Sequence, residues 1–142
     1  MICLGIETSC DETSVALVEN GRRILSNVVV TSADFHRKHG GVIPEIASRM
    51  QLQTIDLVAK AALKEAGVNL KSVKLVSVTS GPGLLGSLLV GISFAKTLSY
   101  GLSIPLIGVN HVISHFYANF LENKSIDFPF VALVASGGHT SL

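Results

Sequence analysis

The sequence has little charge, little cysteine and no long apolar run, and each shortage removes a class of protein. Only 15% of its 142 residues are charged and 48% are apolar, a balance that excludes an intrinsically disordered chain. The longest apolar runs, such as residues 84–92, contain glycine and serine and are far shorter than the roughly 20 residues that cross a bilayer. We therefore expect one compact domain that neither spans nor binds a membrane.

Two cysteines, Cys3 and Cys10, are too few for the disulfide framework of a small secreted domain. The chain opens directly on an apolar run, without a basic leader or a small-residue cleavage site. These features predict free thiols and a cytoplasmic location. Cys10 could in principle be a nucleophile, but no activating base is identifiable near it in the sequence.

The net charge is only +1, so the chain lacks the overall basic character typical of a nucleic-acid-binding domain. The candidates for a local basic patch are Arg22, Arg23, Arg37 and Lys38. An ordinary solvated loop explains the same four residues, and the sequence alone favours that explanation.

The first half of the chain predicts an antiparallel meander followed by a helix. Short β-branched runs occupy residues 2–8, 14–20 and 23–31, and the second ends at an Asn-Gly pair typical of a hairpin. Pro44 then suits a first helical turn, apolar residues follow at helical spacing, and Gly67 ends the predicted helix.

In the second half, strands and helices alternate, which is typical of parallel strands. The predicted elements are a strand at 74–80, a helix at 84–100, a strand at 105–109, a helix from 111 to about 121 and a strand at 130–136. Together with the meander they predict an α/β fold, a ribonuclease H-like mixed five-stranded sheet with flanking helices. Residues 134–142 suggest a strand, a Gly-Gly turn and the opening of another strand, so we expect a chain that is cut within a domain.

His111 and His115 lie four residues apart in an otherwise apolar segment. Asn110 is a good N-cap, so both imidazoles are predicted on one face of the first helical turns, at a spacing that lets them reach one ion. Ligand sites of open α/β sheets also lie where such helices begin. Two ligands cannot close a metal site, and Asp127 and His139 are the candidate third ligands. Two structural histidines at a helix start are the alternative.

Gly81, Gly83 and Gly86 form a literal G-x-G-x-x-G between a predicted strand and a predicted helix. A dinucleotide site also needs an acidic residue about 20 positions on, yet no Asp or Glu occurs between Glu65 and Glu122. The remaining interpretations are a tight turn with close helix packing, or an anion bound near the exposed amides of the helix start.

Two further turns carry polar groups suited to nucleotide chemistry. The segment "ETSCDET" contains acidic and hydroxyl side chains that could hold a hydrated cation beside phosphates, although turn formation alone explains them: Glu7, Asp11 and Glu12 with Thr8, Ser9 and Thr13. In "SGGHT", two glycines offer unobstructed amides. In the predicted sheet, these turns, the glycine-rich turn and the histidines would gather at one cleft.

Taken together, "GIETSCDET", "HGGVIPEIASR", "TSGPGLLGSLLVG", "NHVISH" and "FPFVALVASGGHT" closely resemble the universal tRNA threonylcarbamoyladenosine transferase family, the bacterial TsaD type. The resemblance runs the whole length of the chain. It implies an ASKHA (actin-like ATPase) fold of two ribonuclease H-like lobes around a cleft, of which residues 1–142 would be the N-terminal lobe. Family members are roughly twice this long, and the carboxylate that completes their metal site lies in the half that this chain lacks.

The resemblance also assigns residues. His111 and His115 match the family's metal-binding pair, while Ser9, Asp11 and Glu12 fall in its first nucleotide-side loop, with His139 a further candidate on that side. The residues that match the substrate-bordering segment are Val134, Ala135, Ser136, Gly137 and Gly138. The implied cofactors are one divalent metal ion, iron or zinc, and Mg with an adenine nucleotide.

The implied reaction is an acyl transfer. A threonylcarbamoyl group moves from threonylcarbamoyl-AMP to the exocyclic amine of the adenosine adjacent to the anticodon in tRNA. The implied partners are tRNA, a paralogous ASKHA subunit and an accessory ATPase, and we expect no turnover from this chain alone. The residues do not identify a general base, and no nucleophile-base arrangement supports the older glycoprotease (O-sialoglycoprotein endopeptidase) label.

The chain departs from the family at two positions. Ser114 stands where Gly commonly precedes the second histidine, and Gln51 stands where a histidine is frequent. Ser114 is small and should leave the metal pair intact, whereas Gln51 puts any role of that position in doubt. One alternative function is that of a non-catalytic ASKHA paralogue that dimerises with the enzyme, although that paralogue lacks the histidine pair. Another is that of an ASKHA-type kinase or ATPase.

Overall fold

The computed structural model describes residues 1–37, 39–122, 126–135 and 140–141. The chain starts with three antiparallel strands, β1 (Ile2–Glu7), β2 (Glu12–Glu19) and β3 (Arg23–Thr31). Asn20 and Gly21 both adopt positive φ, 52° and 72°, in a turn closed by the Arg22 amide, which donates to the Glu19 carbonyl. The predicted meander is confirmed.

Two helices precede the next strand of the sheet. Helix α2 (Pro44–Ala66) begins at the predicted proline and ends at Gly67, whose φ of 63° gives the left-handed cap that favours glycine. A short helix α1 (Ala33–Arg37), which the sequence did not predict, precedes it. The single turn η1 (Leu70–Ser72) leads into β4 (Val73–Gly81).

The remaining elements are α3 (Leu85–Leu102), β5 (Leu106–Asn110), α4 (His111–Glu122) and two short strands, β6 (Val134–Ala135) and β7 (Thr140–Ser141). The main sheet has the order β3-β2-β1-β4-β5, and β1, β4 and β5 run parallel. The predicted mixed five-stranded α/β sheet is therefore confirmed. Parallel strands end at the same edge, so the segments that follow β1, β4 and β5 share one end of the sheet.

The predicted strand at 130–136 is wrong in length and in partner. Among the described residues 130–135, only Val134–Ala135 forms a strand, and it pairs antiparallel with Thr140–Ser141 instead of joining the five-stranded sheet. An apolar run predicts burial but not which strand supplies the hydrogen bonds. The two strands expected after residue 134 are present as β6 and β7, and the Gly-Gly turn expected between them lies outside the described residues.

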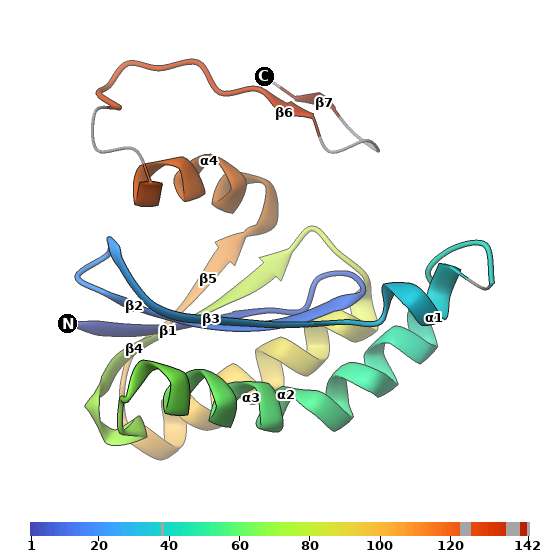
Figure 1. Ribbon diagram of the computed structural model, residues 1–142, viewed down its shortest axis with the longest axis horizontal. Helices are drawn as coiled ribbons and strands as arrows, with labels where there is room; N and C mark the ends of the chain where they lie inside the picture. The colour runs from blue at the N-terminus through green and yellow to red at the C-terminus, as the bar shows by residue number, and fades with distance from the viewer. Residues whose placement is uncertain (38, 123–125, 136–139, 142) are drawn as a thin grey trace.

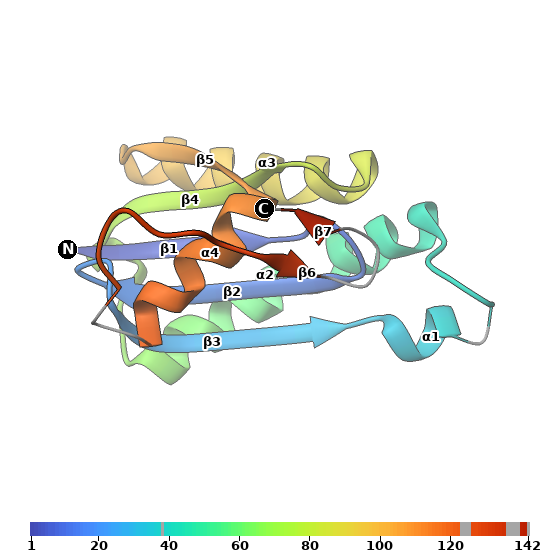
Figure 2. The ribbon, with the colours of Figure 1, turned by 90° about the horizontal axis from the view of Figure 1, so that it is seen from above.

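The hydrophobic core lies between one sheet face and helices α2 and α3, which run side by side below the sheet in Figure 1. Its strand residues are Leu4, Ile6, Val15, Leu17, Val73, Val76 and Val78, and its helix residues are Ile55, Val58, Ala59, Ala62 and Ala95. Helix α4 lies on the opposite side of the sheet and crosses over the strands (Figure 2). The two sheet faces are thus covered very differently.

Helix α3 is long and apolar enough to cross a membrane by length and composition alone, which is weak grounds for a span. It packs on β4 and α2, with Ser87, Leu88, Gly91 and Ala95 buried. A helix that covers the core of a globular sheet meets the same criterion.

Candidate functional site

The histidine pair lies at the start of α4, directly after β5. The Asn110 side-chain oxygen accepts hydrogen bonds from the amides of Val112 (2.9 Å) and Ile113 (3.2 Å), which is the predicted N-cap. The Nε2 atoms of His111 and His115 face one another at 3.2 Å. The structure therefore brings both imidazoles to one point, as the spacing predicted.

The end of β1 holds the other side of the His111 ring. Nδ1 of His111 lies 3.1 Å from Ser9 Oγ and 3.4 Å from Glu7 Oε2. The Glu7 carboxylate also accepts hydrogen bonds from the Ser9 amide and from the Thr79 hydroxyl on β4. One histidine of the pair is thus tied to two neighbouring strands of the sheet.

Burial of the Glu7 carboxyl by itself raises its pKa, but hydrogen bonds from Ser9 and Thr79 and the nearby His111 ring outweigh burial. Together they hold the pKa of Glu7 below its ordinary value. The side chain is therefore an anion around neutral pH, about one third exposed (31%), and it faces a histidine nitrogen.

The loop between β1 and β2, which carries Ser9 and Asp11 and leads into Glu12 at the start of β2, is fixed from the core side. The buried Gln51 amide donates to the carbonyl oxygens of Cys10 (2.9 Å), Glu12 (2.9 Å) and Thr8 (3.4 Å). Position 51 therefore has a structural role in this chain, because the Gln51 side chain braces the loop.

The glycine-rich turn packs against the same loop. A Cβ at Gly83 would lie 2.6 Å from the Ser9 carbonyl oxygen, and a Cβ at Gly91 would lie 2.3 Å from Thr8 Oγ1. The Leu84 amide donates to the Ser9 carbonyl at 2.7 Å. These glycines allow close backbone packing, which explains the motif without a dinucleotide.

Comparison with known families identifies the group to which these features belong. The family described as tRNA N6-adenosine threonylcarbamoyltransferase, TsaD, matches residues 23–142. The chain belongs to this family. Curated relatives of the same name include a protein of Symbiobacterium thermophilum, 57% identical over 141 residues, and one of Thermosipho melanesiensis, 56% identical over 142 residues.

The alignments cover 99% and 100% of this chain but only 41% and 43% of those relatives, so the chain spans about two fifths of their length. Among solved structures, YeaZ from Pseudomonas aeruginosa superimposes with a TM-score of 0.58 and 27% identity, over 77% of this chain and 43% of that one. The fold of this TsaD-family chain is therefore of the ASKHA type.

The paired imidazoles fit a metal ion in their donor chemistry. Two nitrogen ligands at about 2.0–2.1 Å from a tetrahedral metal lie about 3.3 Å apart, close to the 3.2 Å between the two Nε2 atoms. A metal-binding histidine commonly donates its other ring N–H to a carboxylate, the position that Glu7 occupies. The sequence did not assign Thr79 to the site, and it assigned Glu7 only to the possible cation site of the first loop.

The predicted third ligand Asp127 does not join the pair. Within residues 1–37, 39–122, 126–135 and 140–141, no three His, Cys, Asp or Glu side chains gather closely enough to hold a metal ion. Asp127 follows the far end of α4, a helix about 18 Å long, which separates it from His111. The other candidate, His139, lies outside the residues that the structure describes.

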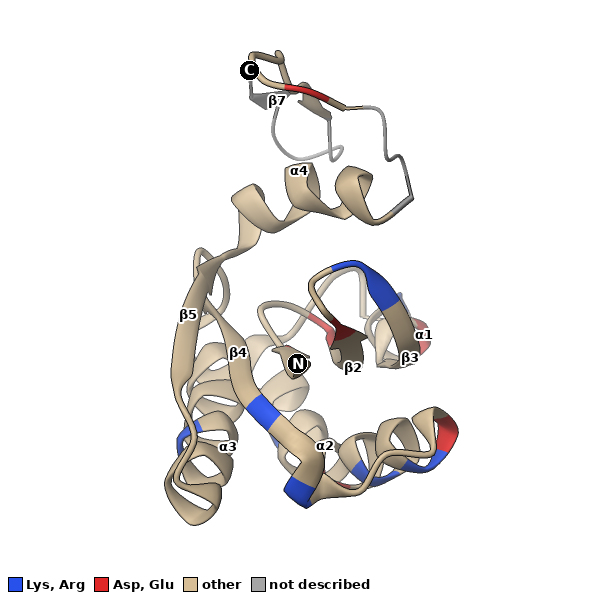
Figure 3. Ribbon diagram, turned by 90° about the vertical axis from the view of Figure 1, so that its left-hand side faces the viewer, with Lys and Arg blue, Asp and Glu red and all other residues tan. Residues whose placement is uncertain are grey.

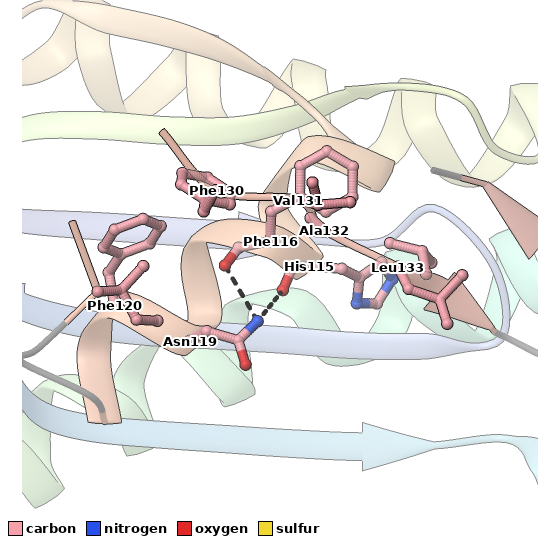
Figure 4. A pocket seen from close by; sticks show the side chains of 10 residues that line it. His115, Phe116, Asn119, Phe120, Phe130, Val131, Ala132 and Leu133 are labelled. Carbon is pink, nitrogen blue, oxygen red and sulfur yellow. Dashed lines mark hydrogen bonds between the residues drawn. The ribbon is translucent and has the colours of Figure 1, made fainter. Parts of the chain in front are cut away.

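The substrate-bordering segment is described only in part. Val134 lines a cavity of about 630 Å³ between α4 and residues 126–134, and His115 contributes to the same wall (Figure 4). Ala135 lies in β6, whereas Ser136, Gly137 and Gly138 lie outside the described residues. The structure therefore places the first residue of this predicted segment beside one histidine of the pair.

The nucleophile and basic-patch interpretations gain no support. Burial and then the neighbouring Asp11 carboxylate raise the pKa of the Cys10 thiol, which keeps it protonated. Arg23 pairs with Glu19 at the start of β3, while Arg37 pairs with Asp34 beyond its other end, about 30 Å away. Figure 3 shows basic residues spread over the hairpin, β4 and the helices below the sheet, and α4 carries none. Lys38 lies outside the described residues.

Proposed function

We propose that this chain is the N-terminal lobe of a metal-dependent tRNA N6-adenosine threonylcarbamoyltransferase. In the reaction, the exocyclic amine of the adenosine adjacent to the anticodon forms a bond to the carbamoyl carbon of threonylcarbamoyl-AMP. The bond from that carbon to AMP breaks, and the amine loses a proton. Family membership supports the activity, and the observation that carries it is the facing pair of His111 and His115 with Glu7 behind the ring.

His111 and His115 would hold one divalent ion, iron or zinc, together with ligands from outside these residues. Such an ion supplies Lewis-acid polarisation of the donor, which a weakly nucleophilic aromatic amine needs. Asn110 and Glu7 orient the imidazoles.

Ser9, Asp11 and Glu12 would bind the AMP side of the donor, and a Mg ion held there would neutralise phosphate charge. The bracing of their loop by Gln51 supports this assignment, because a loop fixed from the core presents its outward groups at constant positions. Residues Val134, Ala135, Ser136, Gly137 and Gly138 would border the threonylcarbamoyl group, and His139 would lie near the nucleotide.

The proposed partners are tRNA, a paralogous ASKHA subunit and an accessory ATPase, all in the cytoplasm. Exposed leucines on α2 and α3, Leu52, Leu57, Leu85 and Leu89, supply apolar surface for a protein partner. We expect Leu89→Glu to lower the affinity for a YeaZ-type paralogue more than tenfold in a pull-down titration. Tyr117→Glu, at an exposed position of α4 on the opposite side of the sheet, is the control, and unchanged binding by both variants would exclude this surface.

The function is tested by His111→Ala in the complete protein that carries this chain as its first lobe. We expect loss of bound metal and at least a hundredfold slower transfer from threonylcarbamoyl-AMP to tRNA. His39→Ala removes an exposed histidine that follows α1, and it should change neither the metal content nor the transfer rate. Normal metal content and normal transfer by His111→Ala would refute the proposal. A complete protein that binds neither metal nor adenine nucleotide would instead favour a non-catalytic scaffold. Residues 1–142 alone should give no turnover.

A further inference from the structure

The contact between Glu7 and His111 joins the first strand of the sheet to the proposed metal pair. Glu7 is the last residue of β1, and its carboxylate reaches Nδ1 of His111, 104 positions later in the chain. Neither the family resemblance nor the spacing of the histidines assigns Glu7 a role. Its geometry indicates one.

The hydrogen-bond partners determine which ring nitrogen carries the proton. Both Glu7 oxygens already act as acceptors, one from the Ser9 amide and the other from the Thr79 hydroxyl. A carboxylate oxygen beside Nδ1 favours a proton on that nitrogen, and Ser9 Oγ at 3.1 Å can accept from it as well. In a neutral imidazole, Nε2 then carries the lone pair.

We propose that Glu7 is a positioning residue that keeps His111 protonated on Nδ1 and so directs the bare Nε2 toward His115. This inference rests on the proposed metal site, since Nε2 is the atom that would bind the ion. Thr79 acts one step further back by holding the carboxylate from the neighbouring strand.

Replacing Glu7 by glutamine should move the His111 ring proton from Nδ1 to Nε2. The Ser9 amide can only donate, so the glutamine oxygen should remain opposite it. The amide nitrogen then faces Nδ1 of His111 and donates to it, which moves the ring proton to Nε2. The Thr79 hydroxyl can rotate to accept, so the substitution leaves few groups unpaired.

The direct test is the ¹⁵N NMR spectrum of the His111 ring in metal-free protein, at a pH about one and a half units above the ordinary histidine pKa of about 6.5. We expect a protonated Nδ1 and a bare Nε2 in the parent protein and the opposite pattern in Glu7→Gln. Glu19→Gln, at the other end of the β1–β2 ladder, should match the parent. A parent His111 protonated on Nε2, or the same tautomer in parent and Glu7→Gln, would overturn the proposal.

A second experiment measures the affinity for Zn²⁺, with no other ligand present, by calorimetric titration. We expect Glu7→Gln to weaken Zn²⁺ binding by 10- to 100-fold, the usual effect of removing such a carboxylate, with no change for Glu19→Gln. Equal affinity in Glu7→Gln and the parent would contradict the proposal. If Glu7→Gln does not fold, the tautomer of the parent decides the matter. The tautomer is measured without tRNA or donor. The experiment can therefore refute the role of Glu7 independently of whether the protein shows transferase activity.

Discussion

The two sides of the histidine pair are built differently. On the sheet side, the ring of His111 contacts Glu7 and Ser9. Glu7 accepts a hydrogen bond from the neighbouring strand β4, and Ser9 belongs to the loop that Gln51 braces. On the other side, His115 borders an open cavity, and residues 126–134 cover α4 through aromatic contacts, with Val131 86% exposed. The position of His111 is therefore determined by the core, whereas that of His115 depends on α4 alone.

The largest expected effect comes from removing the brace of the sheet side. Gln51→Ala leaves the carbonyls of Thr8, Cys10 and Glu12 without their donor and should lower the free energy of unfolding by about 3 kcal/mol. Urea unfolding measures the change. Gln53→Ala, two residues on and exposed, should stay within about 0.5 kcal/mol of the parent. Equal losses in both variants would show that the brace is not specific.

Close packing at the same loop predicts the next effect. A methyl group at Gly91 would meet Thr8 Oγ1, so Gly91→Ala should cost about 2 kcal/mol of stability. Gly101, in the same helix, has open space around it, so Gly101→Ala should instead stabilise by up to about 1 kcal/mol. Thermal unfolding of both variants tests the pair, and a stabilising Gly91→Ala would contradict the packing seen here.

On the α4 side, the cap of the helix is the group whose loss should matter. Asn110→Ala removes the acceptor for two amides and should cost about 1 kcal/mol, while Asn110→Asp retains a cap and should cost much less. Because the cap precedes His111 directly, Zn²⁺ binding should fall in the alanine variant as well. Equal stability of the two variants would mean that sheet contacts alone hold the start of α4.

The same contrast explains what the sequence predicted and what it missed. Local signals were sufficient for the hairpin at Asn20–Gly21, the helix from Pro44 to Gly67 and the cap at Asn110, because each depends on neighbouring residues. The Glu7 contact joins residues 104 positions apart and follows only from the order of strands. The strand at 130–136 was mispredicted for the same reason, since its pairing partner is not a local property.

The smallest expected effect is a pH dependence of stability that originates in Glu7. Its pKa is lower in the folded state than in the unfolded chain, so its stabilisation is fully present above the unfolded value of about 4.3. That stabilisation is lost as the pH falls through the folded value, because protonation removes the anion that Ser9, Thr79 and His111 contact. In urea unfolding, the parent should therefore lose its advantage over Glu7→Gln as the pH falls from about 4.3 through the lower pKa of the folded state. A difference between the two proteins that stays constant across this range would mean that the Glu7 charge does not stabilise the sheet side of the site.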